Sequence, residues 1–488
     1  MALTPSAVEL LGPYLARQRW YAGAREPDSG SLRLLESDCL AETPGGRRLQ
    51  WAIVGVDELR YQLLLADEPT KEGADIGPPA DAAGRLIPAA ALVGAVGGRR
   101  LYDAVVDPEL MLLFYERLAD APATRVRLVG AEQSNTSLVF DERVILKLYR
   151  RLAEGVNPDI EVTSALAMAG FDHVAEPVAT WRADGVDLAF AQRFLAGGAE
   201  GWALAVASAR ELIFGPEDDP AAAPGDFVSE SEDLGHVSAG MHLALAGAFG
   251  VDEDVLAATW GGFVDDLEQR TKAELARGTP VPGGEEDPDG PDAGPDTPSG
   301  DAVKRVFERL RAVRRPGPAL RIHGDFHLGQ VMRADGRWYA LDFEGEPTRS
   351  LEERTRRSSA AKDVAGMLRS IDYAARYALR EVGEGSAGTI AEGAVARAAA
   401  WERRIRAAFL RGYRATPGVG ALMAEGSDGD AVLAAFELDK ALYELRYEEA
   451  YRPDWVGIPR TAIGRTLARL GRPAEAQAGI EWVDSADD

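Results

Sequence analysis

Two short clusters of polar residues lie close together in the sequence, on either side of a turn. Residues 323–330 have the sequence HGDFHLGQ, and residues 341–347 have the sequence LDFEGEP. Between them, Asp335 and Gly336 are flanked by apolar residues, which is the pattern of a β-hairpin turn. We therefore expect a hairpin that brings Asp325 and Asp342 to the same end of one element.

The side chains of these clusters are those that phosphoryl transfer needs. One carboxylate must orient the attacking hydroxyl and accept its proton, and a second must hold Mg²⁺ against the phosphates, usually with an amide oxygen. Asp325, Asp342 and Gln330 supply these oxygens. His323 would hydrogen-bond within the loop, and His327 would stabilise the loop or approach the substrate. Two alternatives stay open: aspartates that only cap a turn, and a zinc site built on the histidines.

A lysine inside an apolar strand indicates a second phosphate contact. Lys147 lies in the sequence VILKLY at residues 144–149, and a lysine there needs a counter-charge or a phosphate. A helix is expected at residues 157–169, because Pro158 suits a first helical turn. We predict Glu161 on that helix as the partner of Lys147, with Asp159 as the alternative. Such a pair positions the α- and β-phosphates of ATP in kinases.

Two further segments are candidates for nucleotide binding. Residues 130–137, with the sequence GAEQSNTS, lie between two expected strands and could cover phosphates through backbone amides and hydroxyls, including that of Ser134. An ordinary hairpin turn is the alternative. Residues 191–198 follow an apolar strand where two halves of the chain would join. Adenine is expected there, beside Gln192, Phe194 and Leu195.

The order of elements predicts an α+β, bilobal, protein-kinase-like fold with an N-terminal α+β cap. The chain has 488 residues, which suggests two or three domains. We expect a cap at residues 1–115, a nucleotide-binding N-lobe at 116–198 and a mainly helical C-lobe at 199–488. Residues 277–301 are almost entirely Pro, Gly, Asp and Glu, and a disordered acidic loop is expected there.

Composition excludes several classes of protein. The net charge is −25 and the pI is about 4.7, so no basic face for nucleic acid or an anionic membrane is expected. Cys39 is the single cysteine, which rules out an intrachain disulfide and a cysteine-rich zinc site. No signal peptide and no membrane-spanning apolar run is expected. These features favour a cytoplasmic protein whose partner is a small molecule, and they do not indicate an oligomeric state.

The chain resembles the aminoglycoside phosphotransferase and choline kinase superfamily, and more closely the actinobacterial maltokinases and maltokinase-like glucosamine kinases. Besides the two clusters, four segments carry the resemblance: 18–23 (QRWYAG), 234–242, 362–370 (KDVAGMLRS) and 443–455. The resemblance implies ATP and Mg²⁺ as cofactors. It also implies that Asp325 is the catalytic base and that Gln330 and Asp342 hold the metal.

The resemblance further implies a sugar site between the catalytic loop and the helices at residues 437–455. The residues expected to contact the sugar are Asp325, His327, Glu344, Tyr443, Glu444, Glu448 and Trp455. The alternative for the helical residues is an amphipathic helix, with Leu438, Leu442 and Leu445 in the core and the acids facing water.

Two departures from the maltokinase pattern favour an amino sugar. Ala24 stands where a lysine usually follows the Trp-Tyr-Ala-Gly stretch, and Tyr451 stands where an asparagine often precedes Arg-Pro-Asp-Trp. Carboxylates such as Glu344, Glu444 and Glu448 would favour a cationic amine. We therefore expect glucosamine as substrate and glucosamine 6-phosphate as product. Alternatives are maltose 1-phosphate formation, an aminoglycoside-type phosphotransferase, a protein kinase and a non-catalytic nucleotide binder.

Overall fold

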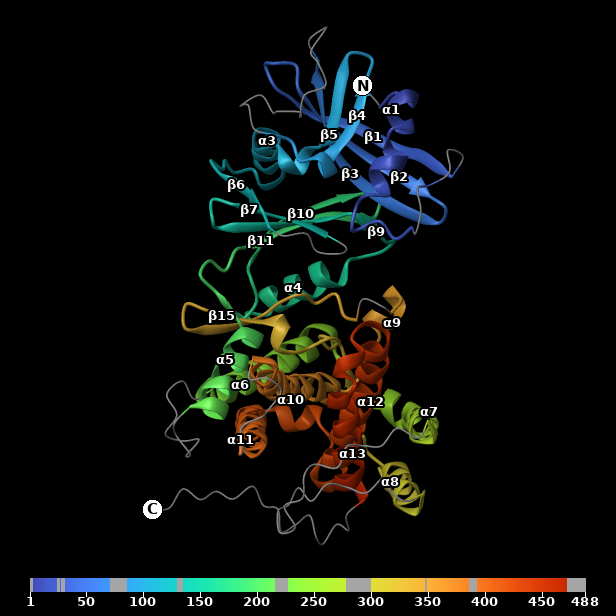
Figure 1. Cartoon of the computed structure of the whole chain (residues 1–488), viewed down its shortest axis with the longest axis vertical. Helices are drawn as coiled ribbons and strands as arrows, with labels where there is room; N and C mark the ends of the chain where they lie inside the picture. Colours follow the sequence, from blue (N-terminus) through green and yellow to red (C-terminus); the bar gives the residue numbers. More distant parts are fainter. Residues whose placement is uncertain are drawn as a thin grey trace. The chain divides into compact units, whose positions relative to one another are not determined.

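The computed structural model describes residues 3–23, 27, 31–70, 86–129, 135–215, 227–277, 300–346, 349–385 and 393–471. Ser134, Ala24 and most of the acidic segment 277–301 lie outside these residues. The chain divides into two compact units, whose elements are labelled in Figure 1. Unit 1 is Met1–Ser164 with Ala175–Gly197, and unit 2 is Ala165–Val174 with Gly198–Asp488. The expected boundaries of the cap and of the N-lobe remain predictions.

Unit 1 begins with an antiparallel sheet beside two short helices. The helices are α1 (Pro5–Glu9) and α2 (Leu11–Leu15), and the sheet has the order β1-β2-β3-β5-β4, with β9 paired to β3. Its strands are β1 (Leu32–Glu42), β2 (Arg48–Val56), β3 (Leu59–Pro69), β4 (Leu92–Val96), β5 (Arg99–Asp103) and β9 (Arg151–Leu152). The expected hairpin of β2 and β3 is confirmed, and Asp57 turns it with a φ of 53°. The short 3₁₀ turns η1 (Ala89–Ala91) and η2 (Ala104–Val106) flank β4 and β5.

A second sheet in unit 1 has the order β10-β11-β8-β7-β6. Its strands are β6 (Val126–Leu128), β7 (Asn135–Phe140), β8 (Val144–Tyr149), β10 (Pro177–Ala183) and β11 (Val186–Arg193). Helix α3 (Pro108–Ala119) belongs to unit 1, and helix α4 (Pro158–Met168) begins in unit 1 and ends in unit 2. Gln62 connects the two sheets: its amide donates to the carbonyl oxygens of Tyr149 (3.1 Å) and Leu188 (2.8 Å), and it accepts from the Trp51 indole. Because buried residues of both sheets form one core cluster, the sheets make one folding unit.

Unit 2 is mainly helical, as predicted. Its helices are α5 (Gly201–Phe214), α6 (Val228–Phe249), α7 (Val255–Ala276), α8 (Gly300–Ala312), α9 (Leu351–Thr355), α10 (Ala360–Gly385), α11 (Ala394–Ala415), α12 (Gly426–Tyr451) and α13 (Gly457–Gly471). The 3₁₀ turns are η3 (Leu328–Gln330), η4 (Val419–Leu422) and η5 (Pro453–Trp455). The strands are β12 (Ala199–Glu200), β13 (Val251–Asp252), β14 (Ala319–Leu320), β15 (Val331–Ala334) and β16 (Arg337–Ala340).

The hairpin predicted between the two acidic clusters is present in unit 2. Strands β15 and β16 pair antiparallel, from Val331 opposite Ala340 to Ala334 opposite Arg337. Asp335 (φ 49°) and Gly336 (φ 73°) turn it, both in the left-handed region that a tight hairpin turn requires. The hairpin therefore connects the catalytic-loop sequence to the loop that carries Asp342.

Helices α6 and α11 pack at very short distance, because glycines face the opposite backbone. A Cβ atom on Gly412 would lie 1.9 Å from the carbonyl oxygen of Glu232, and one on Gly235 would lie 2.1 Å from that of Phe409. Any larger residue at either position would force the helices apart. This packing matters for the site, since α6 supplies the buried His242, whose Nδ1 lies 2.7 Å from the hydroxyl of Tyr413 on α11.

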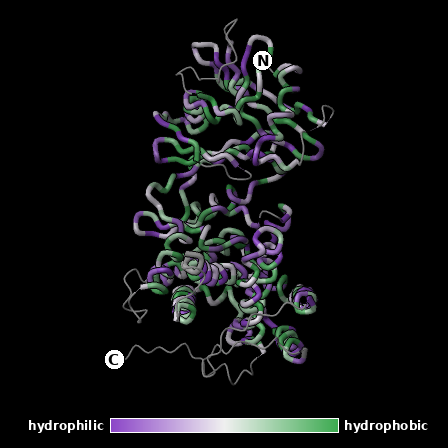
Figure 2. The backbone as a smooth tube through the Cα atoms, in the orientation of Figure 1, coloured by the Kyte–Doolittle hydropathy of each residue, from purple (hydrophilic) through white to green (hydrophobic). Residues whose placement is uncertain are grey.

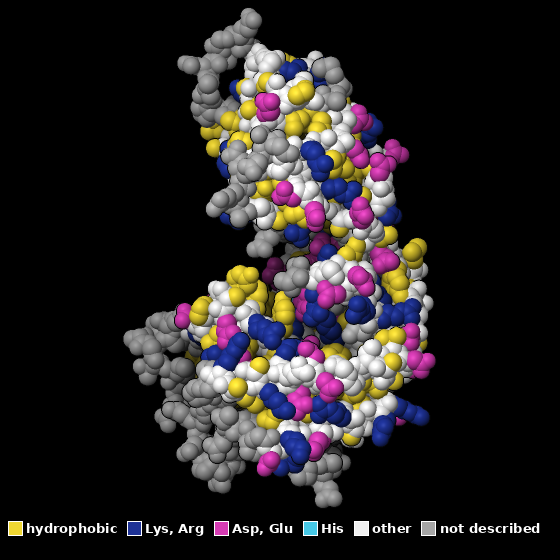
Figure 3. Space-filling model, turned by 90° about the vertical axis from the view of Figure 1, so that its right-hand side faces the viewer, with side chains coloured by type: hydrophobic (Ala, Val, Ile, Leu, Met, Phe, Trp, Pro, Cys, Tyr) yellow, Lys and Arg dark blue, Asp and Glu magenta, His cyan; other side chains and the backbone are white. Residues whose placement is uncertain are grey.

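Polar and apolar residues are mixed along both units. Figure 2 shows hydrophobic and hydrophilic stretches interleaved along the backbone, and Figure 3 shows acidic and basic side chains interspersed over the displayed face. Among the described helices, none combines the length and the apolar character that a bilayer span requires.

Candidate active site

A buried carboxylate of helix α10 forms hydrogen bonds with the backbone of the loop that contains Asp325. Asp363, in the first turn of α10, accepts hydrogen bonds from the backbone N–H groups of His323 (2.7 Å) and Gly324 (2.9 Å). His242 of α6 contacts the same carboxylate through Nε2 at 3.1 Å. Burial opposes the charge of Asp363, but the hydrogen bond and charge of His242 hold its pKa below the ordinary value. The loop thus rests on a fixed, ionised anchor.

His323 connects the two acidic clusters. Its Nε2 donates to the carbonyl oxygen of Leu341 at 2.9 Å, and its Nδ1 lies 3.4 Å from the backbone N–H of Asp325. The ring also contacts those of Phe326 and Phe343, with centroids 5.2 and 4.7 Å away. The structural role predicted for His323 is confirmed, and it extends beyond its own loop.

Asp325 lies against a lysine that sequence reasoning missed. Its Oδ1 is 3.1 Å from Nζ of Lys440 on helix α12, and its Oδ2 is 3.8 Å from Nε2 of His327. Burial raises the pKa of Asp325, but the charges of Lys440 and His327 outweigh it and leave the pKa below the ordinary value. Asp325 is therefore ionised at neutral pH and can accept a proton. Lys440 also contacts Glu346, with Nζ 3.3 Å from Oε1.

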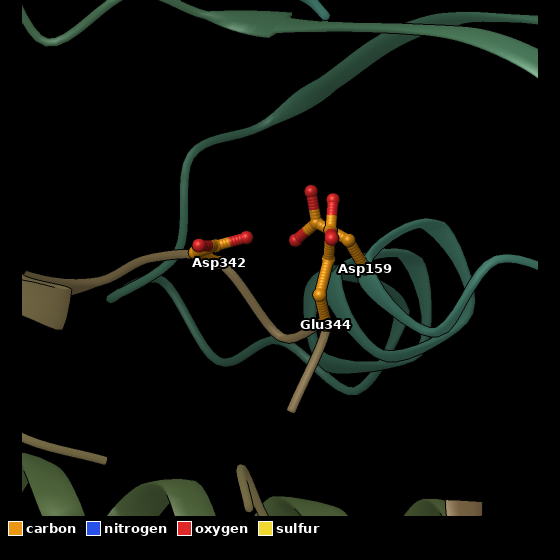
Figure 4. Close-up of side chains that lie close together, drawn as sticks. All are labelled: Asp159, Asp342 and Glu344. Carbon is orange, nitrogen blue, oxygen red and sulfur yellow. The ribbon is translucent and has the colours of Figure 1, made fainter. Parts of the chain in front are cut away.

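Gln330 and Asp342 lie together, as the hairpin predicted. The Gln330 amide donates to Oδ2 of Asp342 at 3.3 Å, and the Leu341 N–H donates to the Gln330 backbone carbonyl at 2.9 Å. The side-chain oxygen of Gln330 and the carboxylate of Asp342 are the groups that could bind a cation here. Asp342 has a φ of 61°. Figure 4 shows Asp342 and Glu344 on the loop after β16, and Asp159 on α4.

The zinc alternative finds no support in the described part of the chain. Within it, no histidine takes part in a group of three or more side chains at metal-ligand spacing, and the one such group consists of carboxylates. His327 instead caps the 3₁₀ turn η3, where Nδ1 accepts from the Gly329 N–H at 3.0 Å. Burial is the largest cause that lowers the pKa of His327 below its ordinary value. The oxygen donors of Gln330 and Asp342 are the kind that Mg²⁺ prefers.

A small pocket in unit 2 opens beside the catalytic loop. Its walls include Asp325 and Glu346 from the two loops, and Asp439, Lys440 and Tyr443 from α12. The expectation that Tyr443 lies near the catalytic loop is therefore met by the geometry. Asp439 and Glu346 are pocket residues that sequence reasoning did not identify; Glu346 was visible only as part of the LDFEGEP motif.

Glu444 and Glu448 do not face water, so the simple amphipathic-helix alternative is wrong for these two residues. Glu444 accepts from Arg369 at 2.7 and 3.0 Å, and Glu448 accepts from Arg452 at 2.7 and 2.8 Å. Burial raises the pKa of Glu444 in spite of Arg369 and Lys440. Trp455 stacks on a tyrosine, and the guanidinium carbon of Arg452 lies 5.2 Å from the centroid of the Trp455 ring. All three predicted sugar contacts therefore have arginine neighbours.

In unit 1, Lys147 is buried on β8 and forms an ion pair. Its Nζ lies 2.8 Å from Oδ2 of Asp159 in the first turn of α4. Asp159, the alternative partner, makes this contact. The predicted pairing of Lys147 with Glu161 stays a prediction. Asn157 caps the start of this helix, where its side-chain oxygen accepts from the backbone N–H of Asp159 at 2.8 Å.

The segment expected to contact adenine uses two of its N–H groups within the chain. The Arg193 N–H donates to the carbonyl oxygen of Glu176 at 2.8 Å, and the Phe194 N–H donates to that of Arg143 at 2.7 Å. Gln192 is buried in β11, and Leu195 is buried as well. Ser134, in the loop expected to cover phosphates, is outside the described residues.

Comparisons with known proteins identify relatives of this chain. Residues 14–107 match the model of the maltokinase N-terminal cap domain. The chain is 30% identical over 360 residues to a glucosamine kinase of Streptacidiphilus jiangxiensis, across 70% of this chain and 74% of the relative. A glucosamine kinase of Mycolicibacterium smegmatis is 28% identical, across 72% of this chain and 81% of the relative.

Solved structures show the same fold. A glucosamine kinase in complex with glucosamine, ADP and inorganic phosphate has a TM-score of 0.63 at 23% identity, covering 95% of this chain and 99% of that chain. A second glucosamine kinase structure has a TM-score of 0.62 at 25% identity, covering 95% and 99%. Fold and site thus define a phosphotransferase with a kinase-like α+β fold and an N-terminal cap, as predicted. Within this class, the chain belongs to the glucosamine kinase family.

Proposed function

We propose that the protein transfers the γ-phosphate of ATP to glucosamine and forms glucosamine 6-phosphate. The observation that carries the proposal is the ionised Asp325, which faces a pocket walled by α12, in a chain that matches glucosamine kinases over most of its length. The relatives indicate glucosamine as the sugar, and the pocket beside Asp325 could receive its hydroxyl.

In this proposal each side chain of the two clusters has one task. Asp325 orients the sugar hydroxyl and accepts its proton, while Asp363 and His323 fix the loop from which it acts. Gln330 and Asp342 hold Mg²⁺, which, when bound, neutralises the phosphates and orients them. Both residues offer oxygen donors from a backbone fixed by the hairpin, so they fit this ion.

ATP would be held by unit 1. Lys147, which forms an ion pair with Asp159, would contact the phosphates. Glu161, on the same helix as Asp159, and Ser134 are the other residues proposed to bind ATP. Because the N–H groups of Arg193 and Phe194 are used within the chain, adenine would be bound by other groups of this segment, with Gln192, Phe194 and Leu195 as the predicted contacts.

The amine of the sugar would be bound by carboxylates near the pocket, and Tyr443 and Trp455 would contact the ring. His327 and Glu344 complete the proposed substrate contacts. Glu444 and Glu448 already accept hydrogen bonds from Arg369 and Arg452, so an amine at either position would have to share the carboxylate with an arginine. A cytoplasmic location is proposed as well, on the supply of ATP there and on the single cysteine.

A coupled ADP-release assay with ATP and Mg²⁺ tests the proposal against glucosamine, glucose, N-acetylglucosamine, maltose and an aminoglycoside. Turnover with glucosamine, and not with the N-acetylated sugar, supports an enzyme that recognises the free amine of its substrate. The second candidate is a maltokinase, which the match to the maltokinase cap domain favours. Turnover with maltose alone would establish that candidate and reject glucosamine.

A further inference from the structure

Lys440 connects the sugar-facing helix to the catalytic base. It projects from α12, and its ammonium lies between two carboxylates, 3.1 Å from Oδ1 of Asp325 and 3.3 Å from Oε1 of Glu346. We propose that Lys440 is a positioning residue for the reaction: it holds one oxygen of Asp325 and thereby presents the other to the acceptor hydroxyl. This inference rests on the proposed role of Asp325 as catalytic base.

The two oxygens of Asp325 have different surroundings. Oδ1 is occupied by Lys440, whereas Oδ2 lies 3.8 Å from His327, beyond direct hydrogen-bond distance. A carboxylate can rotate about its terminal torsion, since this torsion is only weakly restricted. An ammonium bonded to one oxygen removes this freedom. A hydroxyl that enters the pocket then meets Oδ2 in one orientation, which is the condition for efficient proton acceptance.

The ion pair with Glu346 restricts the motion of the Lys440 side chain. Glu346 is almost fully buried, and it also contacts Arg349. The lysine is therefore fixed at its far end by a carboxylate that is itself held by an arginine. Lys440 also lies over the ring of Tyr443, with Nζ 4.9 Å from the centroid. The same turn of α12 thus supplies a pocket wall and the residue that aligns the base.

The test compares Lys440→Met and Lys440→Arg with the wild-type enzyme, on whichever sugar of the panel the wild type phosphorylates best. Lys440→Met is expected to lower kcat by about 100-fold, the usual effect of a misplaced reacting group, and to leave the KM for ATP unchanged. Lys440→Arg keeps a cation at this place and is expected to recover part of the loss. Lys304→Met, at an exposed lysine of α8, is the matched control and is expected to change nothing.

A double variant separates positioning from simple charge balance. Lys440→Met with Glu346→Gln removes one charge of each sign, so the net charge of the pocket is unchanged. If Lys440 positions the base, this variant has the low kcat of Lys440→Met. A kcat close to wild type in the double variant, or in a folded Lys440→Met variant, would overturn the inference. Absence of glucosamine turnover in the wild type would reject the proposed substrate instead.

Discussion

Two lysine–aspartate pairs lie in the two units, and they differ in how far they are open to solvent. In unit 1, Lys147 and Asp159 are 2.8 Å apart, with side chains only 10% and 1% exposed. In unit 2, Lys440 and Asp325 are 3.1 Å apart, with side chains 20% and 19% exposed and both in a pocket wall. The first pair holds the charge of Lys147 within a sheet. In the second pair Lys440 contacts only Oδ1 of Asp325, so Oδ2 can bind a ligand.

This contrast indicates a division of tasks. A deeply buried pair keeps a lysine in one place, which suits the binding of phosphates that do not change during the reaction. A partly open pair combines a fixed geometry with access for a substrate hydroxyl, which suits a base. Variants of the two pairs should therefore affect different kinetic constants.

Asp325→Asn should have the largest effect. Asparagine can still contact Lys440, but it does not accept the proton, and kcat should fall by about 10² to 10⁴, the usual contribution of a general base. Steady-state kinetics with saturating ATP and sugar measure the loss. A thermal melt like that of the wild type serves as the control, and near-normal turnover in a folded variant would remove Asp325 from this role.

Asp342→Asn should change the need for magnesium. Asparagine tolerates the left-handed backbone that Asp342 adopts, so the loop should keep its shape while one ligand charge is lost. The Mg²⁺ concentration for half-maximal activity should rise by about tenfold or more, equivalent to about 1.4 kcal/mol of binding. A magnesium titration in the ADP-release assay measures it. An unchanged titration curve would assign the metal to other residues.

Lys147→Met should weaken ATP binding and spare the sugar. Loss of a charge-assisted contact costs about 1.5–3 kcal/mol, so the KM for ATP should rise by about 10- to 100-fold. The KM for the sugar should be unchanged, in contrast to variants around Asp325. Asp159→Asn offers a matched comparison, since it removes the partner and keeps the lysine. Equal effects of Lys147→Met on both KM values would contradict the division of tasks.

How far the sequence predicts these two pairs depends on the local pattern. Lys147 stands out, because every neighbour on its strand is apolar. Lys440 does not, because α12 buries residues on several faces and carries charges throughout, so one lysine among them gives no signal. The hairpin and its acidic clusters were predictable, since turn residues and spacing are local. The anchors Asp363 and His242 come from distant helices, and only the fold brings them together.

The contact between Lys147 and Asp159 shows the same limit. Asp159 and Glu161 both lie in the first turn of α4, so their positions in the sequence do not decide which carboxylate contacts the lysine. The arginine partner of Glu444 could not be predicted, because Arg369 lies on another helix. Arg452 lies four residues after Glu448, a spacing at which a helical ion pair can be predicted, but sequence reasoning did not use it. Residue type predicted the chemistry of the site, but not the pairing of its charges.

Glu437→Gln should have the smallest effect on catalysis and a clear effect on stability. Burial raises the pKa of Glu437, but Arg406 and Arg469 outweigh it and lower the pKa from 4.5 to about 2. A lowered pKa stabilises the fold above the unfolded value, here by about 3 kcal/mol at neutral pH. This contribution is lost as the pH falls from 4.5 toward 2. Denaturant unfolding of both proteins across this range should show a gap that closes at low pH, and a constant gap would refute the assignment.

The central claim is tested most directly by identifying the product. The wild-type enzyme is incubated with ATP, Mg²⁺ and equal concentrations of glucosamine and maltose, and the phosphosugars are identified by phosphorus NMR and mass spectrometry. The proposal predicts that glucosamine 6-phosphate accumulates and that Asp325→Asn forms almost none. Formation of maltose 1-phosphate as the only phosphosugar, or of none at all by a folded wild-type enzyme, would contradict it.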